Sequence, residues 1–145
     1  MDAAVARNKD HGVVAAVARS AEGYYLGSSA VLIHGISDPE VLEAIAVREG
    51  QNLALDIAAT KIKVASDCLS VVKAWKEKNL GRYSQILHEI TASSVAFSEF
   101  SLVHENRCSN NEPHVLARSV LGSLVGRYMW LGVPPVGVCI PDILK

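Results

Sequence analysis

The chain has few cysteines, no cysteine pair at metal-binding spacing and no long apolar run. Cys68, Cys108 and Cys139 stand far apart, with neither a CxxC motif nor a zinc-type Cys/His spacing. We therefore expect free thiols in a reducing compartment, not a disulfide framework. No apolar stretch is long enough to span a bilayer, and the N-terminus lacks the basic start and apolar core of a secretory signal. These absences predict an intracellular protein with no membrane partner.

The chain also lacks a surplus of charge of either sign. Its 14 Lys and Arg residues nearly balance 15 Asp and Glu, which leaves a net charge of −1. The overall field therefore offers no attraction to a polyanion, and a nucleic acid would have to be bound by a local basic patch. With half of its 145 residues apolar and a fifth charged, the chain is expected to fold as one globular domain.

Hydrophobic patterns predict the element order β-β-β-α-β-α-α-β-α. Short apolar strands at residues 1–6, 13–20 and 24–34, joined by tight turns, are typical of an antiparallel meander. A long helix is predicted from Pro39, with Asp38 as its N-cap. The later elements are expected to be a strand at 61–65, helices at about 68–78 and 83–97, a strand at 99–105 and a helix at 114–126.

This order predicts an α/β fold with a five-stranded mixed sheet and helices on both faces. A meander followed by crossover connections makes the sheet antiparallel at one side and parallel at the other. The first strand then lies centrally beside the fourth, in the strand order 3-2-1-4-5. We expect the domain to extend over residues 1–126. The apolar tail at 127–145 contains three prolines and is predicted to be irregular, either packed on the domain or in contact with a second copy in a homodimer.

Four side chains with metal-binding or acid–base chemistry are predicted to converge. Asp67 follows the strand at 61–65, and Asp2 lies on the neighbouring first strand. Glu43, in the long helix, and His114, at the start of the last helix, can reach the same patch. Clustered carboxylates repel one another unless a cation lies among them, and oxygen-rich sites suit Mg²⁺ or Mn²⁺. Two such ions can activate a water and stabilise the leaving oxygen in phosphodiester cleavage.

Each of these residues also has an ordinary structural interpretation. Asp67, within "SDCLS", is suited to cap the helix that follows it. Glu43 and Asp2 are then solvated side chains, and His114 is a helix-terminal residue in contact with water. Only the combination of the four residues with the element order favours a site.

Four segments resemble a known family: "DAA" at 2–4, "GVVAAVARSAEG" at 12–23, "LEAIAVREGQNLALDIAATKIKVASDCLSVV" at 42–72 and "HENRCSNNEPHVLAR" at 104–118. With them the chain resembles the ribonuclease H-like domain in its plant reverse-transcriptase-like branch, found alone or attached to retroelement-derived proteins. The resemblance extends over about residues 1–126. Its third segment is the specific one, and it implies the ribonuclease H-like fold.

The resemblance implies an endonuclease that hydrolyses the RNA strand of RNA/DNA hybrids by two-metal-ion cleavage. The family's site is an Asp-Glu-Asp-Asp set that binds two Mg²⁺ ions, for which Mn²⁺ can substitute. By position, Asp2, Glu43 and Asp67 match the first three acids. His114 stands in place of the fourth, where an imidazole can still ligate a divalent ion. His104 matches a loop histidine that assists proton transfer or product release.

Further residues are predicted to contact the nucleic acid. The small Ala3 and Ala4 allow the backbone of a hybrid to approach, and the resemblance adds Asn110. A helix with interleaved lysines and an aromatic residue is expected to contact the phosphates of the DNA strand through Lys73, Trp75, Lys76, Lys78 and the later Arg82. The alternative for this helix is a solvated face with Trp75 packed inward.

Two other functions remain open. A catalytically weakened or inactive module of the same fold would bind nucleic acid or a protein. His114 and the short first strand favour this alternative, whereas the intact Asp2, Glu43 and Asp67 oppose it. The same chemistry on another substrate, as in exonucleases or resolvases, is opposed by the plant-type segment at 42–72.

Overall fold

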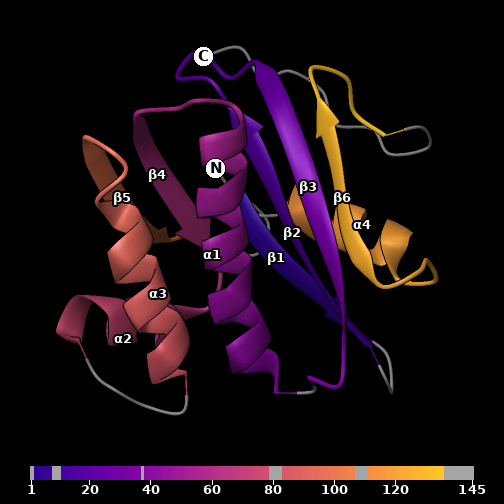
Figure 1. The fold of residues 1–145 in the computed structure, drawn as a ribbon, viewed down its shortest axis with the longest axis horizontal. Coiled ribbons are helices and arrows are strands. Elements are labelled where there is room, and N and C mark those ends of the chain that lie inside the picture. The colour runs from indigo at the N-terminus through magenta and orange to yellow at the C-terminus, as the bar shows by residue number, and fades with distance from the viewer. Residues whose placement is uncertain (1, 8–10, 37, 79–82, 107–110, 136–145) are drawn as a thin grey trace.

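In a computed structural model of the chain, a six-stranded sheet lies between helices on both of its faces (Figure 1). The structure describes residues 2–7, 11–36, 38–78, 83–106 and 111–135, and for residues 2–4 and 7 it describes the backbone alone. The strands are β1 (Asp2–Arg7), β2 (His11–Arg19), β3 (Tyr25–His34), β4 (Lys61–Ser66), β5 (Glu99–His104) and β6 (Gly126–Leu131). The helices are α1 (Pro39–Asp56), α2 (Leu69–Glu77), α3 (Ser84–Ser94) and α4 (Asn111–Val120).

The strand order across the sheet is β5-β4-β1-β2-β3-β6. The meander pairs antiparallel, and β4 pairs parallel with both β1 and β5. The predicted class and the order of the first five strands are therefore confirmed. Of the registered pairs, β1 shares only Asp2↔Ala65 and Ala3↔Ser66 with β4. Strand β4 therefore ends beside the first residues of β1, and Asp67 follows at that point.

The sixth strand corrects the prediction of five strands and a wholly irregular tail. Residues Gly126–Leu131 pair antiparallel with β3, from Leu32↔Gly126 to Gly27↔Leu131. Both Met129 and Leu131 are exposed, so the apolar/polar alternation typical of a strand is missing from the sequence. The strand forms because these residues pair with β3, and this pairing leaves no signal in the local sequence pattern. The end of the predicted tail, 136–145, lies outside the described residues.

Helix boundaries follow local signals where capping residues are present. Asp38 caps α1 as predicted, because its side chain accepts a hydrogen bond of 3.0 Å from the Glu40 N–H. At the other end of the chain, α4 begins at Asn111 and ends at Val120, earlier than predicted at both ends. His114 therefore lies within the first turn of α4. No described helix has the length and apolar character needed to cross a membrane.

Apolar side chains cover the sheet on both faces. Val14 and Val64 pack beneath α1, α2 and α3, whereas Val13 and Val17 pack beneath α4. Each such burial stabilises the fold by about 1.5–3 kcal/mol. Helix α1 lies across the front of the sheet and α4 behind it (Figure 1). Their opposite placement brings the amino-terminal turns of two helices to the region where β4 ends.

Candidate functional site at the end of β4

Asp67 lies at the turn from β4 to α2. The buried Ser66 stabilises this turn, because its hydroxyl accepts a hydrogen bond of 3.1 Å from the Cys68 N–H. The Ser66 carbonyl also accepts one of 3.0 Å from the Glu105 N–H. Cys68, not Asp67, is the N-cap residue of α2, and no side chain caps that helix. The capping interpretation of Asp67 is therefore wrong, and its carboxylate is directed to other partners.

His114 is the described partner of Asp67. Its Nε2 lies 2.9 Å from Asp67 Oδ2, and its Nδ1 lies 3.2 Å from the Val5 carbonyl oxygen on β1. The side chains of His114 and Asp67 are 3% and 11% exposed, so this contact is almost removed from water. A buried contact of this kind orients a carboxylate more firmly than a solvated one. The histidine thus connects α4, β1 and the end of β4.

An ion pair between α4 and β2 also contributes to the placement of α4. Glu112, in the first turn of α4, pairs with Arg19 at the end of β2. Arg19 also donates a hydrogen bond of 3.1 Å to the Gly23 carbonyl. Neither residue of the pair stands out in the sequence. They are 93 positions apart, so no local pattern connects them.

Glu43 approaches the same region from α1. A Cβ atom at Gly12 would lie 2.8 Å from the Leu42 side chain, so this glycine lets α1 pack closely on β2. Glu43 follows Leu42 and is partly buried. Burial raises the pKa of the Cys68 thiol, and the negative charge of Glu43 raises it further. The carboxylate of Glu43 therefore lies near Cys68, the residue after Asp67.

Two further predicted residues are placed by their strands. Asp2 is paired with Ala65 across the β1–β4 ladder, and His104 is paired with Ser66 across the β4–β5 ladder. His104 is exposed, whereas the side chain of Asp2 lies outside the described part of the chain. The ladders thus bring the backbones of both residues beside the β4–α2 turn.

Some of the side chains in this region are suited to bind a hard divalent cation. Carboxylates such as Asp67 and Glu43 are the ligands that Mg²⁺ and Mn²⁺ prefer. Within the described ranges, no group of three or more His, Cys, Asp or Glu residues is arranged to hold a metal ion. A complete set needs the carboxylate of Asp2. His114 differs from the acids because both of its ring nitrogens contact protein oxygens.

The predicted nucleic-acid residues fall into three groups. Lys73, Lys76 and Lys78 are exposed on α2 and at its end. Trp75 instead packs inward, with its ring edge on Phe100 at a centroid distance of 5.5 Å. The inward-packed alternative for this tryptophan is therefore the observed one. Outside what the structure describes are Arg82, Asn110 and the side chains of Ala3 and Ala4.

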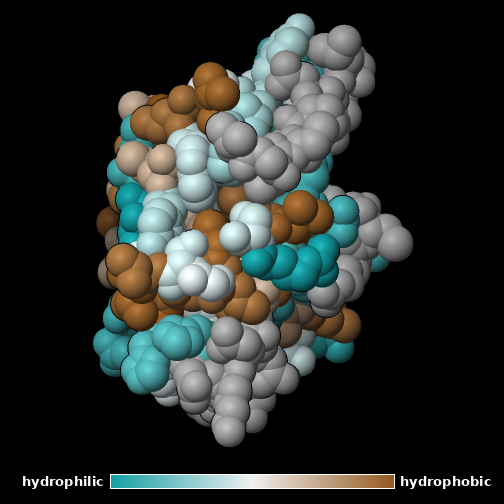
Figure 2. Space-filling model, turned by 90° about the vertical axis from the view of Figure 1, so that its right-hand side faces the viewer, coloured by the Kyte–Doolittle hydropathy of each residue, from teal (hydrophilic) through white to brown (hydrophobic). Residues whose placement is uncertain are grey.

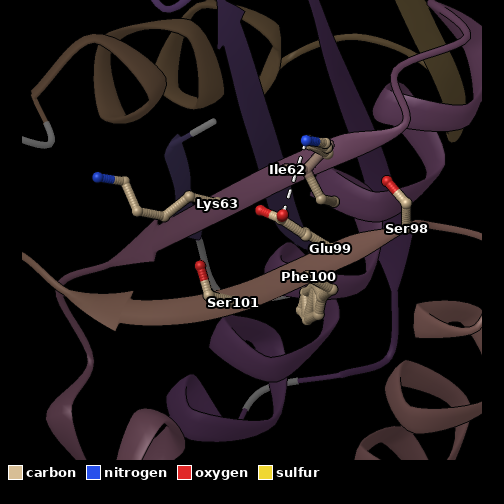
Figure 3. A pocket seen from close by; sticks show the side chains of 7 residues that line it. Ile62, Lys63, Ser98, Glu99, Phe100 and Ser101 are labelled. Carbon is tan, nitrogen blue, oxygen red and sulfur yellow. Dashed lines mark ion pairs between the residues drawn. The ribbon is translucent and has the colours of Figure 1, made fainter.

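An open depression of about 710 Å³ lies elsewhere, over the first halves of β4 and β5 (Figure 3). Lys61 and Glu99 form an exposed ion pair of 3.7 Å across it, and Lys63 points away from Glu99. Both parallel strands begin at this hollow. It therefore lies at the opposite end of β4 from Asp67, about 16 Å along the strand. It contains none of the predicted site residues.

Comparison with protein families matches residues 1–120 to the family described as reverse transcriptase-like. Comparison with curated protein sequences gives no match. The family match includes β1, α1, the β4–α2 turn and α4, and therefore every element that contributes to the region around Asp67.

Solved structures of ribonucleases H share the fold. RNase H1 from the halophilic archaeon Halobacterium salinarum is 18% identical, with a TM-score of 0.75 over 81% of this chain and 92% of that one. The N-terminal RNase H domain of a Mycobacterium tuberculosis protein is 20% identical, with a TM-score of 0.72 over 83% and 89%. LC11-RNase H1, solved in complex with an RNA/DNA hybrid, is 13% identical, with a TM-score of 0.70 over 81% and 92%. At these identities the likeness establishes the fold.

Proposed function

Because the chain belongs to the reverse transcriptase-like family and has the fold of ribonuclease H, we propose that it is a divalent-metal-dependent endonuclease for RNA/DNA hybrids. The observation that carries the proposal is the nearly buried carboxylate of Asp67 at the carboxyl end of β4. Ligands of open α/β sheets bind outside the carboxyl ends of the strands. A carboxylate held there, between β1, α1 and α4, suits a cation that contacts phosphate.

In this proposal three carboxylates bind the metal ion, and His104 transfers a proton or assists product release. Asp2, Glu43 and Asp67 supply carboxylate oxygens to Mg²⁺, for which Mn²⁺ can substitute. The bound metal would supply an activated water and stabilisation of the leaving oxygen. The exposed His104 lies one ladder position from the turn, where it can move a proton or assist product release. The family resemblance implies two ions.

The proposed substrate is the RNA strand of an RNA/DNA hybrid. A ribonuclease H1 of the same fold has been solved with such a hybrid, which supports nucleic-acid binding by this chain. Helix α2 starts directly after the site, and Lys73 lies about 6 Å along its axis from the first helical residue. Lysines at this distance can contact phosphates beside the scissile bond. Recognition of the RNA strand would rest on its 2′-hydroxyls.

One observation favours a second candidate, a catalytically weakened module that binds nucleic acid or protein. His114 contacts Asp67 directly, and a carboxylate oxygen so engaged is not offered to a cation. If this contact persists when metal is added, cleavage would be slow although the fold and the basic surface are intact.

The experiment is cleavage of an end-labelled RNA/DNA hybrid in Mg²⁺ and then in Mn²⁺. We expect cutting of the RNA strand that falls by at least about a hundredfold in Asp67→Asn, because the substitution removes a charge aimed at the reacting centre. Glu22→Gln is the matched control, since it neutralises a carboxylate in an exposed turn. Single-stranded RNA and duplex DNA of the same sequence test the alternative substrates.

The outcomes separate the two candidates. Metal-dependent cutting that is lost in Asp67→Asn and kept in Glu22→Gln supports the nuclease. A folded protein that cuts nothing in either metal contradicts it. Retained binding of the hybrid would then support a nucleic-acid-binding module. If the protein does not bind the hybrid either, a module that binds another protein is the remaining candidate.

A further inference from the structure

Two histidines contact each other across the β2–β3 hairpin. His11 begins β2, His34 ends β3, and the two residues are direct partners in the antiparallel register. Their ring centroids lie 5.1 Å apart, and the ring planes are tilted by 57°. The next pair on the same face of the sheet is Val13↔Leu32, which is buried beneath α4. His11 is half-buried and His34 is exposed, so the imidazoles continue this face beyond the core to solvent.

The histidine pair is remote from the region around Asp67. Asp2, which lies beside the end of β4, is paired with Val17 on β2. From His11 to Val17 the strand rises by about 20 Å. The pair therefore lies at the other end of the sheet, and an inference about it does not depend on the proposed nuclease function.

The distance and tilt of the two rings suit joint ligation of one metal ion. An ion bound by an imidazole nitrogen lies in the plane of that ring, so parallel stacked rings cannot share an ion, whereas planes tilted by 57° intersect. A Zn–N bond is about 2.0–2.1 Å long, and two imidazoles on one tetrahedral ion then have their centroids about 5 Å apart. The observed centroid distance of 5.1 Å matches this value. Strand pairing thus sets the separation of the ligands before an ion arrives.

From this geometry we propose that His11 and His34 form a binding site for one divalent transition-metal ion of the Zn²⁺, Ni²⁺ and Cu²⁺ group. Imidazole nitrogens suit these ions, whereas Mg²⁺ and Mn²⁺ prefer carboxylate oxygens. In the part of the chain that the structure describes, no third His, Cys, Asp or Glu completes a ligand group. Water therefore fills the remaining coordination positions.

An ion at this site joins the open ends of β2 and β3. The opposite end of the hairpin is closed by its turn, where the Gly23 N–H donates to the Ser20 carbonyl and the Ser20 N–H donates to the Tyr24 carbonyl. A ligand that binds the folded chain and not the unfolded one stabilises the fold, and more so as its concentration rises. Metal binding therefore raises the melting temperature, and the rise requires both imidazoles.

The test is isothermal titration calorimetry with Ni²⁺, in a buffer that contains excess Mg²⁺ to occupy oxygen-rich sites. We expect His11→Gln and His34→Gln each to bind Ni²⁺ at least about tenfold more weakly than the wild type, because loss of a mere hydrogen-bond partner of a ligand typically costs about 10–100-fold. His88→Gln, which removes an exposed histidine of α3, is the matched control. Circular dichroism checks that each variant folds.

Two further readouts separate a metal site from an ordinary cross-strand ring contact. In nuclear magnetic resonance spectra, Zn²⁺ should shift the ring nitrogen signals of His11 and His34 and leave that of His88 unchanged. The melting temperature should rise with Zn²⁺ in the wild type and in His88→Gln, and should not respond in either variant of the pair. A contact that only packs the rings would give no response to metal.

The outcomes decide the inference directly. Loss of Ni²⁺ affinity in both His11→Gln and His34→Gln, with His88→Gln unchanged, supports the two-histidine site. If the folded wild type binds no Ni²⁺, the site does not exist. If either variant of the pair binds Ni²⁺ as tightly as the wild type, the ion is held elsewhere and the inference is wrong.

Discussion

The side chains around Asp67 divide into those that fix the turn and those to which the proposed function assigns chemistry. Ser66 belongs to the first kind, since its hydroxyl satisfies the Cys68 N–H and lets the chain leave β4 without a cap from Asp67. Asp67, Glu43 and His104 are the residues of the second kind in the proposed function. Between them lies Cys68, whose half-buried thiol responds to the charge of its surroundings.

Cys68 provides a test of this environment without substrate or metal. Burial and the nearby carboxylates raise its pKa, so the thiolate forms only at higher pH than in an ordinary cysteine. We expect alkylation by iodoacetamide, in buffer with EDTA, to be slower at neutral pH than in the urea-unfolded chain and to rise with pH. Peptide mass spectrometry resolves Cys68 from the other cysteines. Equal rates in the folded and unfolded chains would contradict the described burial.

Helix α2, which begins directly after the β4–α2 turn, carries exposed positive charge. Its inner face packs on β5 through Trp75 and Phe100, which leaves the lysines in solvent. The helix thus has a structural face and a basic face, and the tryptophan belongs to the former.

Neutralising the basic face should weaken hybrid binding in a salt-dependent way. We expect the combined substitution of Lys73, Lys76 and Lys78 by Gln to lower the slope of log K against log salt by about one for each lost phosphate contact. Lys61→Gln with Lys63→Gln is the matched control, since these lysines lie at the far end of β4. Fluorescence anisotropy over a salt series measures both. An unchanged slope in the triple variant would exclude α2 from the interface.

Strand β6 is attached to α1 through an ion-pair network. Arg127 Nε donates to Glu49 Oε1 at 2.8 Å, and its NH2 group donates to Asp56 Oδ2 at 2.6 Å. The side chain of Glu49 is only 4% exposed, and it also accepts a bond of 2.7 Å from the Ser29 hydroxyl. The guanidinium therefore balances a buried charge as well as fixing the strand.

Removing that guanidinium should destabilise the fold. Arg127→Met leaves Glu49 buried without its cation, and we expect the free energy of unfolding to fall by about 1–3 kcal/mol. Arg48→Met removes a similar group from a pair with Glu89 in which both side chains are about one-third exposed, and it should cost under about 1 kcal/mol. Urea unfolding followed by circular dichroism measures both. Equal losses of unfolding free energy in the two variants would mean that the burial of Glu49 does not strengthen the contribution of its ion pair.

The whole molecule presents an apolar surface on its β6 side. Figure 2, viewed from that side, shows brown patches among polar ones. The strand is at the edge of the sheet, and edge strands with apolar side chains favour contact with another chain. The exposed apolar residues on this strand and beside it are Leu124, Val125, Met129, Leu131 and Val133.

The homodimer predicted from the apolar tail can be tested on this surface. We expect sedimentation velocity to show a mass that rises toward a dimer with concentration, and Met129→Lys with Leu131→Lys to abolish the rise. Val95→Lys is the control, because Val95 is also apolar and is more exposed than Met129 or Leu131, but follows α3. A monomer at all concentrations would mean that β6 tolerates its exposed apolar groups.

Local sequence patterns were sufficient for most of the fold. The tight turns of the meander and the crossovers after it predict the order of five strands, and Asp38 with Pro39 marks the start of α1 correctly. Strand β6 could not be found in this way. Its side chains do not alternate in polarity, and its partners lie on β3 and α1, which are distant in sequence.

The same limit applies to the candidate site. The position of Asp67 after a strand, and of Glu43 in the first turns of a helix, is a local property that the sequence alone determines. The direct contact of His114 with Asp67 is not, because the two residues are 47 positions apart. That contact exists because α4 packs on the sheet, through apolar side chains such as Leu116 and through the Arg19–Glu112 ion pair. Periodicity places residues on elements, but only the packing of those elements decides which side chains reach hydrogen-bonding distance.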